Sequence, residues 1–466
     1  MVPLHASRAS PRIVTGATVF HRERERHMPP EPSAIITPPR TLKRAEPTVA
    51  LQPQPPGMKH RFHAMIKPVG SLCNLDCKYC YYLHKQDLLL QPRQPRMGEG
   101  MLERHIRQYI EAQTGDEVVF SWQGGEPTIL GLDFFRTVVS LQERYRKPGQ
   151  RIENDLQTNG TLLDEEWAAF LKENGFLVGL SCDGPKELHD LYRYTKGGAD
   201  THAKVVAAAR LLQKHEVPFA ALCVVNRENA KHPLEVYRFL TRELGAWRVQ
   251  LISCVEPKVF RDVAPQHWDP ALMPIVGTPR AKPGDPDSVV TDWSVDPDDW
   301  GSFLCAVWDD WYANDFGRVH VDLFETAVAQ SMGLPSQRCI TAEFCGKGLA
   351  VEHNGDVFSC DHYVYPEYRL GNIADVHLGT MAYSERQKKF GFAKRDTLPQ
   401  YCRECPHLKL CWGECPKNRL VRTPSGDVGL SYLCPGLKRF YSHIQRDMPQ
   451  ILQRVAIPIP RQGASR

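Results

Sequence analysis

The sequence has no run of about 18 consecutive apolar residues, the length that a membrane-spanning helix needs. Long runs of like charge are also missing, and a net charge of +4 over 466 residues gives no sign of a nucleic-acid partner. The N-terminal residues include no apolar segment of the kind found in secretory signal peptides. We therefore predict a cytoplasmic protein that binds neither nucleic acid nor a membrane.

Cysteine, by contrast, is plentiful, with 15 residues, an odd number. Eleven of them fall into a triplet near the front of the chain and a group of eight in the last third. Secreted disulfide-rich proteins reach this density, but they are usually short and carry a signal peptide. In a reducing cytoplasm, clustered cysteines are better explained as metal ligands.

Strand-like and helix-like segments alternate from about residue 60 onwards. The apolar or β-branched runs that predict strands are 62–67, 118–122, 152–157, 177–181, 218–225 and 248–254. Between them, helices are predicted at 100–113, 132–147, 164–174, 201–215 and 233–244. Such repeated β–α units build a parallel sheet with helices packed outside it. Six units predict an α/β fold with a partial (β/α)6 barrel rather than the full eight-stranded form.

The other parts of the chain differ in composition. Residues 1–57 are rich in proline and arginine, which predicts a disordered extension before the barrel of residues 58–300. Prolines crowd the end of the barrel region and predict an insertion over 256–300. The segments predicted to follow are a helical connector at 301–338, a cysteine-rich domain at 339–440 and a tail at 441–466.

The first cysteine motif, Cys73-x3-Cys77-x2-Cys80, lies in the loop after the first predicted strand. In parallel β/α sheets, ligand-binding loops emerge at this end of the strands. Three thiolates at these spacings can hold one [4Fe–4S] cluster and leave its fourth iron without a protein ligand. Two alternatives are a Cys₃His zinc site that includes His84, and plain core cysteines.

A second motif, the WQGGEP segment from Trp122 to Pro127, follows the second predicted strand. Its glycines allow the backbone to approach a ligand with no Cβ in the way, although a glycine pair can also form a simple turn. Together the two motifs resemble those of the radical S-adenosylmethionine (SAM) superfamily, over about residues 60–255. The resemblance implies a [4Fe–4S] cluster and SAM as cofactors, with the methionine amino group held by backbone oxygens and the Glu126 carboxylate.

The same resemblance implies further contacts to SAM. The residues that would make contacts are Tyr79, Gly125, Glu126, Ser181, Arg193 and Val255. Ser181 and Arg193 would contact the ribose and the carboxylate, and Val255 would pack near the adenine. Simpler alternatives are a turn at Asp183-Gly184 and a surface ion pair for Arg193.

The eight later cysteines are enough for two Cys₄ sites, and their spacing alone does not distinguish iron–sulfur clusters from zinc. Their order resembles the SPASM domain, within which the nearest resemblance is to the anaerobic sulfatase-maturating enzymes. This resemblance implies two auxiliary [4Fe–4S] clusters, and hence three clusters in all. The implied ligands are Cys339, Cys345, Cys360 and Cys415 for one cluster, and Cys402, Cys405, Cys411 and Cys434 for the other.

Asp361 directly follows Cys360 and matches the proposed general base of that family. The resemblance implies that a 5′-deoxyadenosyl radical removes a Cβ hydrogen from a target Cys or Ser, while Asp361 accepts the proton of its thiol or hydroxyl. The product would be Cα-formylglycine in a sulfatase. Tyr82 and Gln123 would contact the substrate. The alternatives are a turn cap for Asp361 and aromatic packing for Tyr82.

The implied partners are an unfolded or nascent sulfatase polypeptide with a CxPxR or SxPxR motif, and an electron donor such as flavodoxin or ferredoxin. An alternative function is a SPASM peptide maturase that forms thioether or other cross-links in a different peptide. A second alternative is a zinc-dependent interaction protein without enzymatic activity. The sequence does not distinguish a Cys-type from a Ser-type target.

Overall fold

Parallel strands and outer helices alternate in the computed structural model, which describes residues 49–51 and 61–455. All described residues belong to one unit of the chain, Glu46–Arg466. Most of the predicted extension 1–57 and the end of the predicted tail therefore lie outside the described residues. Within the two described ranges, no helix combines the length and the apolar character needed to cross a membrane.

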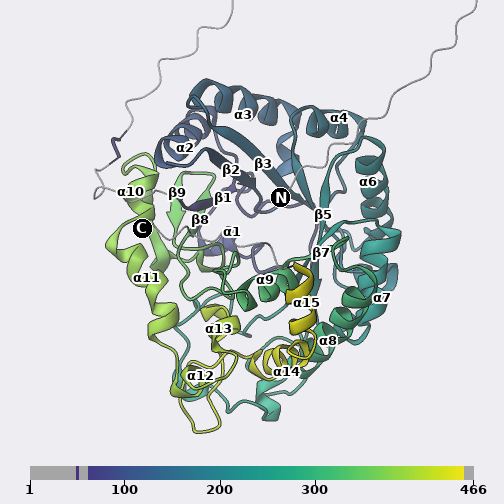
Figure 1. Ribbon diagram of the computed structural model, residues 1–466. Helices are drawn as coiled ribbons and strands as arrows, with labels where there is room; N and C mark the ends of the chain where they lie inside the picture. The colour runs from purple at the N-terminus through teal and green to yellow at the C-terminus, as the bar shows by residue number, and fades with distance from the viewer. Residues whose placement is uncertain (1–48, 52–60, 456–466) are drawn as a thin grey trace, which may run out of the picture. The chain divides into compact units, whose positions relative to one another are not determined.

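Within the described residues, ten strands form one sheet in the order β10-β9-β8-β1-β2-β3-β4-β5-β6-β7 (Figure 1). Neighbours from β8 to β7 run parallel, whereas β9 and β10 pair antiparallel. The strands are β1 (His63–Lys67), β2 (Glu117–Trp122), β3 (Arg151–Thr158), β4 (Leu177–Ser181), β5 (Phe219–Val225), β6 (Arg248–Ser253), β7 (His320–Val321), β8 (Gly348–Glu352), β9 (Asp356–Phe358) and β10 (Arg369–Asn372). The six predicted strands correspond to β1–β6 and are confirmed.

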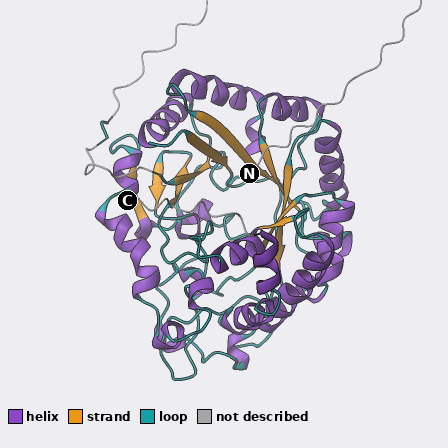
Figure 2. Cartoon of the chain, in the orientation of Figure 1, coloured by secondary structure: helices purple, strands orange, loops and turns teal. Residues whose placement is uncertain are grey.

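The helices between the strands lie on the outer side of the sheet (Figure 2). Those predicted from the sequence are α2 (Glu99–Ala112), α3 (Leu132–Tyr145), α4 (Glu165–Glu173), α6 (His202–Lys214) and α7 (Pro233–Arg238), followed later by α8 (Pro297–Asn314) and α9 (Asp322–Ser331). The remaining helices are α1 (Lys85–Leu88), α5 (Lys186–Asp190), α10 (Leu378–Ala382), α11 (Glu385–Asp396), α12 (Gln400–Arg403), α13 (Leu408–Cys411), α14 (Cys434–Ile444) and α15 (Met448–Val455).

Local sequence signals explain these helices. The helix α4 begins at Asp164, whose side chain accepts a hydrogen bond from the backbone N–H of Trp167 at 2.9 Å. One hydrophobic core extends from the strands to α8 and α14, where the rings of Trp308 and Phe440 are 6.0 Å apart. The apolar face predicted for α6 is buried in this core, and its residues are Val205, Ala208, Ala209 and Leu212.

The sheet is longer than the six strands predicted, because the cysteine-rich segment adds strands to one edge. Strand β8 pairs in parallel with β1, with Glu352 opposite Lys67, and β9 and β10 extend this edge. The two-residue strand β7 extends the other edge. The sequence did not predict β8 because its five residues stand among cysteines, outside the strand–helix alternation. The cysteine-rich segment is thus joined directly to the barrel sheet.

The proline-rich insertion packs against the cysteine-rich segment. Between β6 and α8 it contains two short 3₁₀ turns, Pro270–Leu272 and Pro279–Ala281. The hydroxyl of Tyr365 donates to the carbonyl of Phe260 at 2.5 Å, and other hydrogen bonds join the insertion to the loop before α14. These contacts place the insertion beside the segment that follows Cys360.

Candidate active site

The triplet loop, residues 68–80, is fastened to the GGEP turn after β2. The backbone N–H of Gly125 donates to the carbonyl of Gly70 at 2.9 Å, and that of Glu126 donates to the carbonyl of Leu72 at 2.8 Å. A Cβ on Gly125 would lie 1.9 Å from the Leu72 oxygen, so the glycine is required by the close approach of two backbone segments. The two motifs therefore form one unit at the carboxyl ends of neighbouring strands.

The Glu126 carboxylate is buried and joins the ends of β2 and β3. One oxygen accepts hydrogen bonds from the hydroxyls of Thr128 and Thr158, both at 2.7 Å, and from the backbone N–H of Thr128 at 3.2 Å. The other oxygen accepts from the backbone N–H of Asn159 at 2.7 Å. These four bonds fix the orientation of the carboxylate at the rim, where the family resemblance assigns it to the methionine amino group.

The three thiols of the triplet are partly buried. Burial raises the pKa of Cys73 and Cys77 to about 12, and it also raises the pKa of Cys80. The backbone N–H of Leu75 lies 3.4 Å from the Sγ of Cys73, and the Asn159 amide nitrogen lies 3.9 Å from it. Thiols bind metals as thiolates, and a bound cation offsets the cost of burying that charge. This donor set therefore fits an iron–sulfur cluster.

Arg193 and Tyr79 meet at a carboxylate that the sequence analysis did not single out as a site residue. The Arg193 Nε donates to Asp183 at 2.9 Å, and the Tyr79 hydroxyl donates to the same oxygen. The other Asp183 oxygen accepts from the backbone N–H of Val224 at 2.9 Å. Arg193 thus forms an ion pair, as the simpler alternative had it, but the pair is buried rather than on the surface.

Ser181 and Val255 lie at the same edge of the sheet as the triplet loop. Ser181 ends β4 and is buried, and Val255 follows β6 and is fully buried. The carbonyl of Val255 accepts a hydrogen bond from the Lys417 ammonium at 2.6 Å, and the same ammonium pairs with Glu256 at 2.7 Å. Lys417 stands two residues after Cys415, so this ion pair links the barrel rim to the cysteine-rich segment.

Asp361 opens a short 3₁₀ turn directly after Cys360. Its carboxylate forms an ion pair with the ammonium of Lys67 and accepts a hydrogen bond from the hydroxyl of Tyr81. Lys67 ends β1 and Tyr81 directly follows Cys80, so the two partners come from opposite ends of the triplet loop. Both contacts cross between distant segments, whereas a turn cap would stay within its own turn.

The electrostatics keep Asp361 ionised. Burial raises the pKa of its carboxyl, but the charge of Lys67 and the hydrogen bonds that the carboxylate accepts outweigh burial, so the pKa is lowered overall. Burial lowers the pKa of His362 to about 4. At neutral pH the site therefore holds a carboxylate beside a neutral imidazole.

The two predicted substrate residues both lie near the ammonium of Lys67. Its ammonium is 3.5 Å from the side-chain oxygen of Gln123 and 4.6 Å from the centroid of the Tyr82 ring. The Tyr82 hydroxyl donates to Glu352, whose other oxygen accepts from the Gln91 amide at 2.9 Å. The hydroxyl of Tyr82 is therefore engaged within the protein, while its ring lies at the site.

The first of the two later groups consists of Cys339, Cys345, Cys360 and Cys415, and we call it the inner cysteine group. Burial and then the charges of Cys339 and Cys415 raise the pKa of the Cys360 thiol. Burial raises the pKa of Cys345 to about 11, and the charge of Cys339 adds to this effect. The buried ammonium of Lys394 donates to the carbonyls of Cys339 at 2.5 Å and Ile340 at 2.9 Å. The charge effects thus link Cys360 to Cys339 and Cys415, and Cys345 to Cys339, in the set that the resemblance assigns to one cluster.

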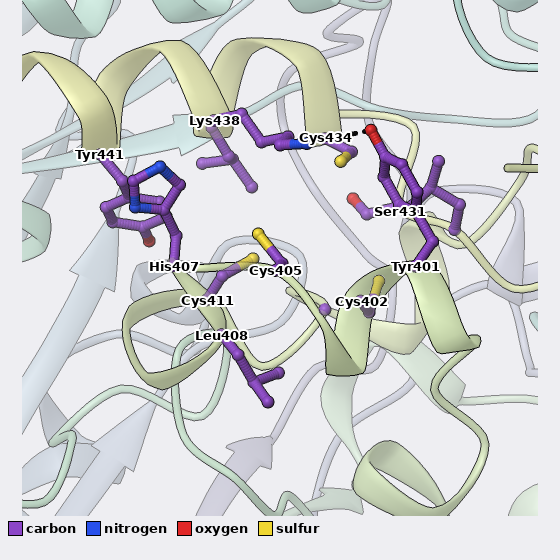
Figure 3. Close-up of a pocket in the computed structure, with 13 residues that line it drawn as sticks. Tyr401, Cys402, Cys405, His407, Leu408, Cys411, Ser431, Cys434, Lys438 and Tyr441 are labelled. Atoms are coloured by element: carbon purple, nitrogen blue, oxygen red, sulfur yellow. Dashed lines mark hydrogen bonds between the residues drawn. The ribbon is translucent and has the colours of Figure 1, made fainter. Parts of the chain in front are cut away.

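The outer cysteine group surrounds one pocket, shown in Figure 3. Its four members are Cys402, Cys405, Cys411 and Cys434. Burial raises the pKa of the Cys411 thiol to about 12. At the edge of the pocket the Lys438 ammonium lies 3.0 Å from the Tyr401 hydroxyl. Four thiols around one pocket fit a Cys₄-ligated cluster by the chemistry of the donor set.

Several buried groups of the site were not predicted from the sequence. Lys67 was a detectable signal, since it is a lysine that follows the apolar residues 64–66 at the end of a strand. Tyr81 directly follows Cys80, but the resemblance implied a role for Tyr82 and none for Tyr81. Lys85 lies buried with its ammonium 3.1 Å from the centroid of the Tyr365 ring, and burial lowers its pKa to about 7. No sequence pattern indicates that contact.

Comparisons with known proteins agree with this geometry. The sequence profile of the radical SAM superfamily matches residues 68–240, and the profile of SPASM, an iron–sulfur cluster-binding domain, matches residues 339–406. Together with the parallel sheet and its cysteine-bearing loop, these matches define the class of the protein. It is a radical SAM enzyme with SAM and [4Fe–4S] clusters as cofactors.

The individual relatives assign the chain to one family within this class. The chain is 42% identical over 382 residues to the serine-type anaerobic sulfatase-maturating enzyme of Bacteroides thetaiotaomicron, spanning 82% of this chain and 89% of the relative. It is 34% identical to the cysteine-type enzyme of Clostridium perfringens, spanning 81% of this chain and 95% of the relative. The structure of native anSMEcpe with bound AdoMet and Cp18Cys peptide matches with a TM-score of 0.70 and 31% identity, over 84% of this chain and 99% of its own. The chain belongs to the family of anaerobic sulfatase-maturating enzymes.

Proposed function

We propose that this chain oxidises a cysteine or serine side chain of a sulfatase to Cα-formylglycine. The observation that carries the proposal is the placement of Asp361. This buried carboxylate adjoins Cys360 in the inner cysteine group and contacts the residue after Cys80 in the triplet. A side chain that loses a Cβ hydrogen must also lose a proton and an electron to become a carbonyl, and the proton acceptor belongs at such a place.

We assign one cluster to each of the three cysteine groups, with the triplet leaving one iron free for SAM. The residues assigned to SAM are Tyr79, Gly125, Glu126, Ser181, Arg193 and Val255. When bound, SAM and its cluster would supply a 5′-deoxyadenosyl radical as the acceptor of the Cβ hydrogen, and the auxiliary clusters would supply an acceptor for one electron. The AdoMet bound in the relative of known structure supports this assignment.

The chain's own residues handle the proton and the position of the target. Asp361 accepts the proton of the target thiol or hydroxyl. Gln123 faces Lys67 with its oxygen, which leaves its amide N–H groups to donate to a substrate carbonyl. Tyr82 offers its ring, because its hydroxyl is bound to Glu352. A serine target that has lost hydrogen atom, proton and electron is an aldehyde, whereas a cysteine target is a thioaldehyde that water converts to the aldehyde with release of hydrogen sulfide.

The partners follow from the same chemistry. The substrate is an unfolded or nascent sulfatase segment, since the named relatives are sulfatase-maturating enzymes and one is bound to a peptide. An external low-potential protein, such as flavodoxin or ferredoxin, delivers the electron that the radical-forming cluster needs.

A peptide assay tests the function. Reconstituted protein is incubated without oxygen with SAM, dithionite and one of two peptides that differ only in a CxPxR or an SxPxR motif. We expect the serine peptide to lose two hydrogens, or the cysteine peptide to lose two hydrogens while oxygen replaces sulfur, as measured by mass spectrometry. A peptide with alanine at the target position is the control. If neither motif changes mass while SAM is still cleaved, the proposal is wrong.

A further inference from the structure

Lys67 is a buried cation whose partners all belong to the proposed site. It is the last residue of β1, and its side chain is 2% exposed. A buried ammonium without a partner is strongly unfavourable, so its environment must supply negative charge. That charge comes from Asp361, which lies in the cysteine-rich segment rather than in the barrel.

Three functional positions from three segments meet at this one ammonium. Asp361 follows β9 and forms the ion pair. Gln123 follows β2, and its side-chain oxygen is 3.5 Å from the Lys67 nitrogen. Tyr82 follows the triplet, and the centroid of its ring is 4.6 Å away. The proposed proton acceptor and both proposed substrate contacts therefore share one neighbour.

The backbone of Lys67 and the aliphatic part of its side chain, here called the stem, are held in place by the fold. Its backbone pairs with Glu352 in the register of β1 and β8. A Cβ on Gly124 would lie 3.2 Å from both the Cα and the Cδ of Lys67, so the GGEP turn packs directly on the stem. The position of the ammonium is thus determined by the sheet and by the turn that the chain would use to bind SAM.

We propose that Lys67 is a positioning residue that sets the place of the Asp361 carboxylate relative to the target side chain. This inference rests on the proposed function. Asp361 is held at two points, by the Lys67 ammonium and by the Tyr81 hydroxyl, and the loss of one point frees the carboxylate to turn away. A displacement of about 1 Å in such a group costs on the order of 10²-fold in rate. Removal of the Cβ hydrogen does not depend on the carboxylate, so it should continue.

Lys67→Met removes the charge and keeps most of the stem, whereas Lys67→Arg keeps the charge. Each variant is given a peptide deuterated at Cβ of the target, and two products are counted: deuterated 5′-deoxyadenosine and formylglycine. We expect Lys67→Met to transfer deuterium as the wild type does, with about 10–100-fold less formylglycine per deuterated 5′-deoxyadenosine. Lys67→Arg should give an intermediate ratio.

The double variant Lys67→Met/Asp361→Asn separates positioning from general damage. If Lys67 acts through Asp361, the double variant should give the same product ratio as Asp361→Asn alone. An unchanged ratio in Lys67→Met, or an equal fall in both products, overturns the proposal. If Lys67→Met does not retain iron, Lys67→Gln takes its place, because it also removes the charge and an unchanged ratio in it overturns the proposal. Failure of the proposed function is distinct, since the wild type would then form no formylglycine.

Discussion

The inner and outer cysteine groups have the same number of thiols but different surroundings. The inner group carries Asp361 beside Cys360 and lies against the barrel through β8. The outer group lies between α12, α13 and α14, with the partly exposed Lys438 at its edge (Figure 3). Under the proposed function, we expect the inner group to take part in the oxidation and the outer group to carry the electron away from it.

One buried cation lies near both groups. Burial lowers the pKa of Arg419, and the charges of Cys402 and Cys415 act to raise it. The guanidinium donates to the carbonyl of Lys394 at 2.7 Å. Its position joins the loops that carry the two groups. Variants that remove one group should therefore be compared with matched variants of the other, so that damage to the shared loops is recognised.

Removal of the inner group should have the largest effect. Cys339→Ala/Cys360→Ala should lose about four iron atoms per chain and all formylglycine formation, because the segment that carries Asp361 loses its anchor. Cys405→Ala/Cys434→Ala should lose the same amount of iron but keep one turnover of formylglycine. Iron analysis and single-turnover mass spectrometry measure both. Equal loss of the single turnover in the two variants would remove the distinction between the groups.

Asp361→Asn should lower formylglycine formation by about 10²–10⁴-fold, the usual contribution of a general base, with the iron content unchanged. The matched control is Asp356→Asn on β9, because Asp356 pairs with the half-exposed Arg369 at 2.6 Å, outside the site. This control should keep near wild-type activity. Rates are measured by mass spectrometry of the peptide, and a wild-type rate in Asp361→Asn would show that another group accepts the proton.

Gly436→Ala should disturb the outer group through helix packing. A Cβ on Gly436 in α14 would lie 2.1 Å from the carbonyl oxygen of Pro297 and 2.8 Å from the nitrogen of Gly301, and backbone atoms cannot easily move away. We expect about 1–3 kcal/mol lower stability in thermal unfolding, with loss of iron from the outer group. Gly100→Ala in α2, where a Cβ would meet nothing within 4 Å, is the control and should not destabilise. Similar results for both variants would contradict this packing argument.

Lys394→Met should have the smallest effect on activity but should change the inner cluster itself. A buried positive charge favours the reduced, more negative form of a nearby cluster, so its removal should shift the reduction potential of the inner cluster to more negative values. Lys438→Met, beside the outer group, is the matched variant and should leave the inner potential unchanged. Electron paramagnetic resonance during a redox titration measures both. A shift of equal size in both variants would show that the two cations do not distinguish the groups.

The sequence predicted the parts of the molecule that depend on local patterns. Six parallel strands, the five helices between them and the cysteine motifs follow from periodicity and spacing, and the structure contains these elements. The extension of the sheet by β8 was not predicted, because pairing between distant strands leaves no local signal. The same limit applies to the site, where Tyr81 and Asp361 are 280 positions apart along the chain.

Residue types alone also left several roles ambiguous. The family resemblance implied that Arg193 contacts SAM, while the structure shows its buried pair with Asp183, which no spacing rule links to it. Lys67 illustrates the opposite case. A lysine at the end of a strand is visible in the sequence, but its role depends on the ion pair with Asp361, which lies in a distant segment of the chain.

The proposed reaction begins when the chain removes a hydrogen from Cβ of a cysteine or serine in a sulfatase motif. It is tested most directly by mass spectrometry of 5′-deoxyadenosine after reaction with a peptide deuterated only at that carbon. We expect one deuterium in the 5′-deoxyadenosine and formylglycine at the target position. A peptide without formylglycine, together with 5′-deoxyadenosine that carries no deuterium, would contradict this reaction.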